Sequence, residues 1–223
     1  MNVSDERSCI TIFFMSKTHC LKEVKTGNFL RKCLFGKRKA YYICNALVMF
    51  NNRKQKSMAE ITFKGMAVHT NGNLPQVGAE APNFRGVKND LSELSLTDLK
   101  GKRVVLNVFP SLDTPVCANS VRRFNKEAAS LPNTVVLAVS KDLPFAQSRF
   151  CTTEGIENVI SLSAFRCSCF EDGYGMLMTD GPLKGLLARG VIVVDEAGKL
   201  IYEELVSEII NEPNYEAALA VLK

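Results

Sequence analysis

A cysteine at the start of an expected helix is the residue with the clearest chemical potential in this sequence. The segment Pro110 to Cys117 reads PSLDTPVC. If Thr114 is the N-cap, Pro115 takes the first helical position, where its missing N–H would be unpaired anyway, and Cys117 falls in the first turn. The backbone N–H groups and the positive end of the helix dipole favour an anion there. We therefore expect the Cys117 thiol to ionise more readily than a free cysteine and to act as a nucleophile.

An inert role for Cys117 stays open on this local pattern alone. Most free cysteines in apolar surroundings are buried residues that pack and do not react. The segment therefore has two interpretations, a nucleophile or a packing residue, and its sequence context has to separate them.

Two apolar runs flank this segment. Arg103 to Phe109 is a nearly continuous β-branched run, typical of a central strand that is covered on both faces. A helical pattern follows from Pro115 to Leu131, and Thr134 to Ser140 predicts a second buried strand. Two apolar strands joined by one helix predict a parallel βαβ unit. Cys117 would then lie at a strand-to-helix switch, where α/β sheets commonly place ligands.

The rest of the chain from Met58 onward also alternates between strand, turn and helix patterns. It predicts a small hairpin at Ile61 to His69 and short strands at Phe84 to Val87, Leu91 to Leu96 and Val159 to Leu162. It also predicts a helix at Phe145 to Cys151, a second hairpin of Gly190 to Asp195 with Leu200 to Leu205, and a final helix at Asn211 to Leu222. The sum is an α/β domain with a mixed central sheet, helices on both faces and an N-terminal β-hairpin. That order is typical of a thioredoxin-like fold.

The charge is distributed unevenly between the first 57 residues and the remainder. Residues 1–57 hold 12 Lys and Arg against 3 Asp and Glu, whereas residues 58–223 hold 16 against 20. The overall net charge of +5 therefore comes from the leader, and the slightly acidic remainder gives no support to a nucleic-acid-binding patch.

Residues 1–57 form a basic leader without a clear helix or strand period. Its longest apolar run, Tyr41 to Phe50, is far shorter than the roughly 20 residues of a membrane helix, and its start lacks the features of a secretory signal. We expect Met58 to be the natural start and the leader to be disordered or an upstream read-through. A transit peptide and an adaptor tail are the alternatives.

The eight cysteines do not follow the spacing of a small secreted disulfide scaffold. Without a secretory signal, a reducing cytoplasm is the simpler interpretation. Cys167 and Cys169 are interpreted as surplus thiols, with metal binding and redox relay as the alternatives. His69, the one histidine from Met58 onward, is interpreted as an exposed strand residue.

Four segments carry a resemblance to a known family: NVFPSLDTPVCANSVRRFN (107–125), DLPFAQSRFCTTEGIENVI (142–160), DGPLKGLLARGVIVVDE (180–196) and EPNYEAALAVLK (212–223). Through them the chain from Met58 to Lys223 resembles the bacterial thiol peroxidases, which are atypical two-cysteine peroxiredoxins. The resemblance implies a thioredoxin-like fold and a homodimer.

By that resemblance Cys117 is the peroxidatic cysteine and Cys151 is the resolving cysteine with which it forms a disulfide. Thr114 would hydrogen-bond the thiolate and the peroxide, and Pro110 would shield the pocket from water. Arg189 matches the family arginine, whose fixed charge would stabilise the thiolate and the developing negative charge on the peroxide.

The implied chemistry begins with attack of Cys117 on a hydroperoxide, which leaves a sulfenic acid that Cys151 captures. Two cysteines on separate helices meet only if their Cα atoms approach within about 7 Å, so local unwinding is expected. The resemblance implies thioredoxin as the reductant, and no metal or organic cofactor is required. Apolar residues at Phe109, Leu112 and Phe145 suggest tolerance of organic hydroperoxides.

Two other functions remain as alternatives. A thioredoxin-like disulfide oxidoreductase would carry a C-x-x-C pair at the helix start, but this chain has Thr114 in place of the first cysteine. A peroxide-sensing redox switch could use the same disulfide to alter a partner surface, and it need not turn over rapidly.

Overall fold

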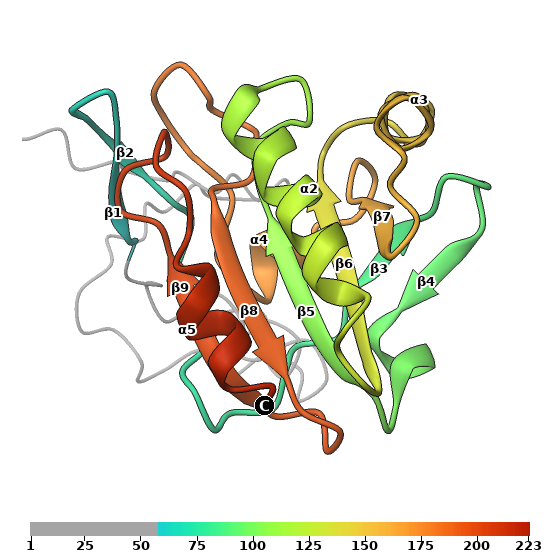
Figure 1. The fold of residues 1–223 in the computed structure, drawn as a ribbon. Helices are drawn as coiled ribbons and strands as arrows, with labels where there is room; N and C mark the ends of the chain where they lie inside the picture. Colours follow the sequence, from blue (N-terminus) through green and yellow to red (C-terminus); the bar gives the residue numbers. More distant parts are fainter. Residues whose placement is uncertain (1–57) are drawn as a thin grey trace, which may run out of the picture. The chain divides into compact units, whose positions relative to one another are not determined.

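A computed structural model of the chain describes residues 58–223, which belong to one compact unit. The predictions for the leader, residues 1–57, lie outside the described residues. Figure 1 shows the fold. The strands are β1 (Glu60–Phe63), β2 (Met66–His69), β3 (Arg85–Val87), β4 (Glu93–Ser95), β5 (Arg103–Val108), β6 (Thr134–Ser140), β7 (Val159–Ser163), β8 (Gly190–Val194) and β9 (Leu200–Leu205). The helices are η1 (Leu96–Leu99, a 3-10 helix), α2 (Pro115–Ala128), α3 (Pro144–Glu154), α4 (Cys169–Asp172) and α5 (Tyr215–Ala220).

The main sheet has seven strands in the order β4-β3-β7-β6-β5-β8-β9. Strand β5 pairs in parallel with β6, and β6 in parallel with β7, whereas β8 runs antiparallel to β5 and β9. The predicted parallel βαβ unit is therefore confirmed, with Val108 opposite Val139 at the ends of β5 and β6. The expected mixed sheet of a thioredoxin-like fold is also present.

Alternation along β5 divides the interior into two cores. Val105 and Phe109 face one core, which also contains side chains from α2, α3 and α5; we call it the helix-covered core. Val104, Leu106 and Val108 face the other core, which contains Phe84, Phe170 and Tyr174; we call it the loop-covered core. In Figure 1, α2 and α5 lie in front of the sheet and α4 lies behind it. Helices therefore occur on both faces.

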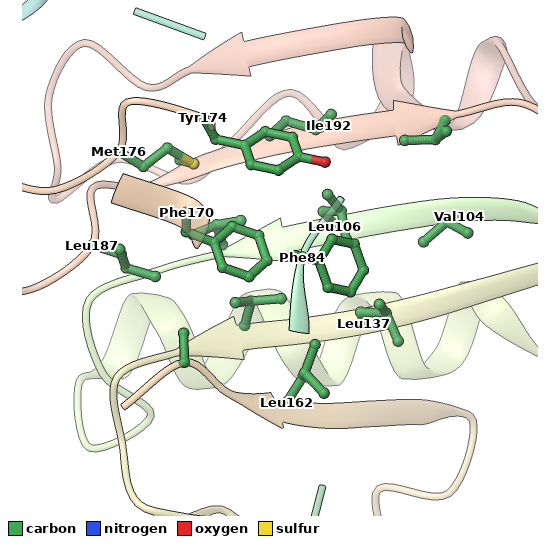
Figure 2. Close-up of a cluster of buried hydrophobic side chains, with 14 of the residues drawn as sticks. Phe84, Val104, Leu106, Leu137, Leu162, Phe170, Tyr174, Met176, Leu187 and Ile192 are labelled. Atoms are coloured by element: carbon green, nitrogen blue, oxygen red, sulfur yellow. The ribbon is translucent and has the colours of Figure 1, made fainter. Parts of the chain in front are cut away.

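The loop-covered core is closed by aromatic side chains and not by a long helix. The Phe84 and Phe170 rings stack with centroids 5.3 Å apart, and Phe170 and Tyr174 stack at the same separation. Figure 2 shows these rings against the sheet residues Leu106 and Ile192. Such stacks stabilise a core beyond the area that they bury.

Element boundaries differ from the prediction mainly in the connections. The final helix begins at Tyr215, because Asn214 accepts a hydrogen bond from the Ala217 N–H and caps it there. The turns η1 and α4 were not predicted, since helices of four residues are too short to show a period.

The predicted N-terminal hairpin, β1 and β2, is present and packs on a small third core of Ile61, Val68, Met178, Ala188 and Ile209. His69 is a strand residue of β2, as expected, and its side chain is 36% exposed. It also has a partner that the sequence did not indicate: its Nδ1 lies 2.7 Å from the Asp180 carboxylate, and its backbone N–H donates to the same carboxylate at 2.7 Å. The hairpin is thus fastened to the segment that leads into β8.

Candidate active site

Cys117 lies where β5 passes into α2, as predicted. Thr114 is the N-cap of α2, with an extended backbone, and Pro115 is the first helical residue. Cys117 follows in the first turn, and its side chain is 0% exposed. The sulfur is therefore close to the positive end of a 14-residue helix and shielded from solvent, which strengthens electrostatic interactions around it.

The Thr114 hydroxyl lies between the sulfur and the backbone. Its Oγ1 is 2.8 Å from Cys117 Sγ and 3.0 Å from the Ser111 carbonyl oxygen. Because a hydroxyl has one proton, it can donate to only one of them at a time. With a thiol at Cys117, the hydroxyl can donate to Ser111; with a thiolate, it can turn its proton to the sulfur. This threonine therefore responds to the charge state of Cys117.

Arg189, which directly precedes β8, contacts the same sulfur although it lies 72 residues further along the chain. It is 2% exposed, and its Nη2 donates to Cys117 Sγ at 3.4 Å. Its Nε donates to the Ile209 carbonyl oxygen at 2.9 Å, whereas its buried Nη1 has no hydrogen-bond partner. No Asp or Glu among residues 58–223 lies within ion-pair distance of this guanidinium.

The Arg189 guanidinium is a buried cation that donates to one carbonyl oxygen and to the Cys117 sulfur. A buried cation without such acceptors is strongly unfavourable. The free Nη1 N–H can then donate to an oxygen atom of a bound molecule.

The N-terminal hairpin holds Arg189 through one intervening residue. The Ile209 N–H donates to the Thr62 carbonyl oxygen of β1 at 2.9 Å, and the Ile209 carbonyl accepts from Arg189 Nε. A continuous set of hydrogen bonds therefore runs from Thr62 through Ile209 and Arg189 to Cys117.

The loop before α2 is fixed by Asp142, which directly follows Lys141 after β6. The Asp142 carboxylate accepts from the Ser111 hydroxyl and from the Leu112 N–H, both at 2.8 Å, and from the Ser140 hydroxyl at 2.8 Å. Pro110, at the start of this loop, is buried. Hydrogen bonds to one carboxylate therefore hold the loop that connects Pro110 to Thr114 and Cys117.

Sequence reasoning missed Asn107, a polar residue within the apolar β5. It is 1% exposed, and its amide donates to the Ser120 hydroxyl at 3.1 Å, which in turn donates to the Cys117 carbonyl oxygen at 2.9 Å. An asparagine inside a run of buried residues was the available signal, because a buried amide needs partners.

Cys151 lies on α3, on the same side of the sheet as Cys117. Both cysteines are free thiols, and both contact the helix-covered core. The Cys151 sulfur lies 3.0 Å from the Ser161 hydroxyl of β7. A disulfide between Cys117 and Cys151 therefore requires both sulfurs to leave their present partners.

Arg122 links the two helices that carry these cysteines. Its Nε and Nη2 donate to the Glu154 carboxylate at the end of α3, at 2.7 and 2.9 Å. These hydrogen bonds lower the pKa of the Glu154 carboxyl below its ordinary value and raise that of Arg122. Within the described chain Arg122 therefore joins α2 to α3.

Cys167 and Cys169 form a disulfide, with Cα atoms 5.4 Å apart. The two thiols interpreted as surplus therefore lie within bonding distance of each other. Within residues 58–223, no three His, Cys, Asp or Glu side chains form a group that could hold a metal ion, and no helix is long and apolar enough to cross a membrane.

Comparisons with known proteins agree with this geometry. Residues 76–219 match the Redoxin family. The chain is 57% identical to a thiol peroxidase from Corynebacterium glutamicum and 56% identical to one from Mycobacterium tuberculosis; each similarity covers 74% of this chain and 99% of the relative. The crystal structure of a peroxiredoxin-like protein from Aquifex aeolicus superposes with a TM-score of 0.71 and 42% identity, over 74% of this chain and 96% of that chain.

These similarities extend over the sheet, the helices and the loop that hold Cys117, and they reach almost the full length of the relatives. Thiol-dependent reduction of peroxides is the chemistry that a shielded cysteine with threonine and arginine donors can support. The chain belongs to the redoxin family and, within it, to the thiol peroxidases, a class of oxidoreductases.

Proposed function

We propose that Cys117 is the peroxidatic cysteine of this thiol peroxidase and that Cys151 is its resolving cysteine. The observation that carries the proposal is the buried Arg189 guanidinium, which donates through Nη2 to Cys117 Sγ and has a second nitrogen, Nη1, with no hydrogen-bond partner. A packing cysteine would not need a buried cation beside it.

In the first step the Cys117 thiolate attacks one peroxide oxygen, an S–O bond forms and the O–O bond breaks. The leaving oxygen takes the electron pair and a proton and departs as an alcohol or water. Arg189 Nη1 donates to the oxygen that becomes negative, and the Thr114 hydroxyl orients the sulfur and the substrate. Buried Pro110 limits access of water to the reacting atoms.

In the second step the Cys151 thiol attacks the Cys117 sulfenic acid, a disulfide forms and water is lost. Because both thiols lie in separate hydrogen-bonded sites, α3 has to unwind locally around Cys151 before this step. An external dithiol then reduces the disulfide with two electrons and two protons.

The reductant proposed is thioredoxin, the substrates are hydrogen peroxide and organic hydroperoxides, and the enzyme works in the cytoplasm as a homodimer. The reductant, the substrates and the dimer follow from the family resemblance, and the cytoplasm follows from the cysteine pattern of the sequence. Phe109 and Leu112 are buried next to the site, which suits an organic substituent, whereas Phe145 is 68% exposed and could contact only a larger substrate.

The experiment is peroxide consumption by the full chain in a single turnover, followed by NADPH loss with thioredoxin and its reductase. Cys117→Ser should abolish the first step. Cys151→Ser should consume one equivalent of peroxide and then stall. Peroxide consumption that survives Cys117→Ser would refute the assignment. Slow or absent turnover of the wild-type chain with every dithiol tested would favour a peroxide sensor.

A further inference from the structure

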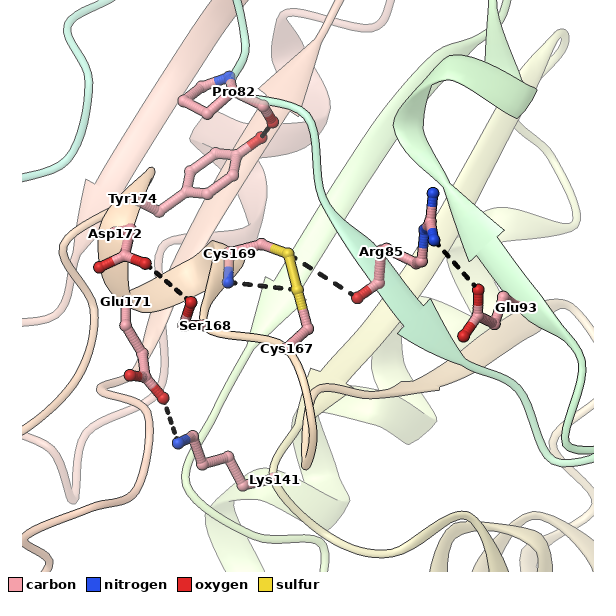
Figure 3. Close-up of a disulfide and its surroundings, with 10 residues drawn as sticks. All are labelled: Pro82, Arg85, Glu93, Lys141, Cys167, Ser168, Cys169, Glu171, Asp172 and Tyr174. Atoms are coloured by element: carbon pink, nitrogen blue, oxygen red, sulfur yellow. Dashed lines mark hydrogen bonds and ion pairs between the residues drawn. A yellow bond between two sulfur atoms is a disulfide. The ribbon is translucent and has the colours of Figure 1, made fainter.

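The disulfide between Cys167 and Cys169 is not used by the proposed peroxide cycle. It lies after β7, both of its cysteines are partly buried, and Ser168 between them is exposed (Figure 3). The Cα separation of 5.4 Å is within the range that a disulfide requires. In the same structure Cys117 and Cys151 are not bonded to each other.

This disulfide does little to hold the fold together. A disulfide stabilises mainly by restricting the unfolded chain, and the effect shrinks with the length of the loop that it closes. Here the sequence separation is 2. The adjoining α4 has anchors of its own, since Phe170 is fully buried between two aromatic rings and Glu171 forms an ion pair with Lys141. A structural role is therefore a poor explanation for this bond.

The pair is also separated from the peroxidatic sulfur by the sheet. Cys169 packs against the loop-covered core, whereas Cys117 and Cys151 contact the helix-covered core. Side chains on opposite faces of a sheet do not meet. Cys167 and Cys169 therefore cannot resolve the Cys117 sulfenic acid or relay electrons to it directly.

One contact prepares the pair for exchange. The Cys169 backbone N–H donates to Cys167 Sγ at 3.2 Å (Figure 3). A hydrogen bond to sulfur stabilises the thiolate more than the disulfide, so Cys167 is the better leaving group when the bond is attacked.

We propose that Cys167 and Cys169 are a second thiol–disulfide exchange site, which takes two electrons from external dithiols and returns them to external disulfides, independently of the peroxide cycle. An external thiolate attacks Cys169 Sγ, a mixed disulfide forms, and the electron pair of the broken bond leaves on Cys167 Sγ. The second external thiol attacks the mixed disulfide, releases Cys169 and becomes oxidised. Two protons from the dithiol end on the two cysteines.

The sequence permits a direct test, because trypsin separates the three cysteine sites. Cleavage after Arg166 and Lys184 yields a peptide with Cys167 and Cys169 and no other cysteine, while Cys117 and Cys151 fall in two different peptides. The full chain is equilibrated in mixtures of reduced and oxidised dithiothreitol without peroxide, alkylated, digested and analysed by mass spectrometry.

The 167–184 peptide should pass reversibly between a doubly alkylated and an internally bonded form. The fraction of this peptide in the reduced, doubly alkylated form should rise from 10% to 90% over about an 80-fold change in the dithiol-to-disulfide ratio, as for any two-electron exchange. Glutathione mixtures should give the same reversibility. A peptide that stays in one form in every mixture, while the protein remains folded, would overturn the proposal.

Two sets of variants test independence. Cys117→Ser and Cys151→Ser should leave the midpoint of the 167–184 peptide within about twofold, and a lost or strongly shifted transition would place the pair inside the peroxide cycle, against the proposal. In the reverse test, Cys167→Ser with Cys169→Ser should keep single-turnover peroxide consumption near the wild-type rate. A large loss there would also contradict independence. Neither experiment depends on the roles proposed for Cys117 and Cys151.

Discussion

At the scale of single residues, the proposed chemistry depends on two donors that differ in kind. Arg189 supplies a fixed charge that is fully buried, and Thr114 supplies one rotatable proton at the exposed edge of the site. Leaving a buried charge without its partner costs about 3–5 kcal/mol, so the contact with the Cys117 sulfur stabilises the buried Arg189 guanidinium.

Replacing Arg189 with lysine should lower kcat/KM for hydrogen peroxide by about 100- to 1,000-fold, the usual effect of losing one donor to a developing oxyanion. Lysine keeps the charge, but one ammonium cannot reach Ile209, the sulfur and a substrate oxygen in the forked geometry of the guanidinium. The matched control is Arg123→Lys, an exposed arginine of α2 paired with Glu216. Equal effects of the two variants would contradict this role.

Replacing Thr114 with valine should reduce single-turnover peroxide consumption by about 100-fold, because the shape is kept and the hydroxyl is lost. Thr114→Ser restores the hydroxyl and should recover most of that loss. Stopped-flow measurement of peroxide loss distinguishes the two. If valine and serine behave alike, the methyl group and not the proton of Thr114 matters.

Some site residues could be predicted from the sequence and others could not. The positions of Thr114 as N-cap and Cys117 in the first turn follow from the local pattern of a helix start, whereas their roles were implied by the family resemblance. Arg189 lies 72 residues from Cys117, so only the family resemblance could place it there. The role of Asp142 depends on the parallel pairing of β5 with β6, which brings their carboxyl ends together; no local pattern marks it.

At the scale of elements, α3 is the helix that the proposed disulfide step requires to move. Two of its residues, Pro144 and Gln147, are buried, and it ends at Gly155 in the left-handed conformation with φ of 63°. The Arg122–Glu154 pair joins its last turn to α2. Few buried contacts make local unfolding easier, so this pair is a main restraint on the release of Cys151.

Replacing Glu154 with glutamine should therefore accelerate disulfide formation after the peroxide step, by about threefold if the pair contributes as exposed ion pairs usually do. Glu157→Gln, an exposed change just beyond α3, is the control and should have no effect. Quenched-flow alkylation reads the disulfide directly. A slower reaction in Glu154→Gln would mean that the pair positions Cys151 for attack.

The elements themselves were predicted with uneven success for physical reasons. Buried strands such as β5 and β6 can be recognised in the sequence by their continuous β-branched runs. The hidden elements are α4 and η1, which are single turns fixed by tertiary contacts such as the burial of Phe170 and Leu99. The disulfide beside α4 was missed because two cysteines one residue apart carry no information on their redox state.

At the scale of the whole molecule, the hairpin of β1 and β2 is fastened to the segment before β8 by His69 and Asp180. Hydrogen bonds from the His69 backbone N–H and then from its ring lower the pKa of the Asp180 carboxyl below its ordinary value of 3.8. A carboxyl with a lowered folded-state pKa stabilises the fold fully above the ordinary value, and this stabilisation is lost as the pH falls through the lowered one.

The hairpin should therefore loosen as the pH falls below 3.8. Asp180→Asn should unfold at a lower temperature than the wild type at neutral pH. The difference between the two unfolding temperatures should disappear in acid. Thermal unfolding from pH 7 to pH 2.5 measures both; the exposed change Glu80→Gln serves as control. A constant gap over this range would show that the carboxylate charge is not what fastens the hairpin.

The hydrogen bonds from Thr62 through Ile209 to Arg189 bear on where a functional enzyme begins. The family match starts at residue 76, and a protein shortened to that point would keep the seven-stranded sheet, both cysteines and the whole loop before α2. It would lack the carbonyl that fixes Ile209, and with it the support of the arginine. If Arg189 has the role proposed above, the smallest catalytic unit is larger than the part of the chain that matches the family, and the difference includes the hairpin.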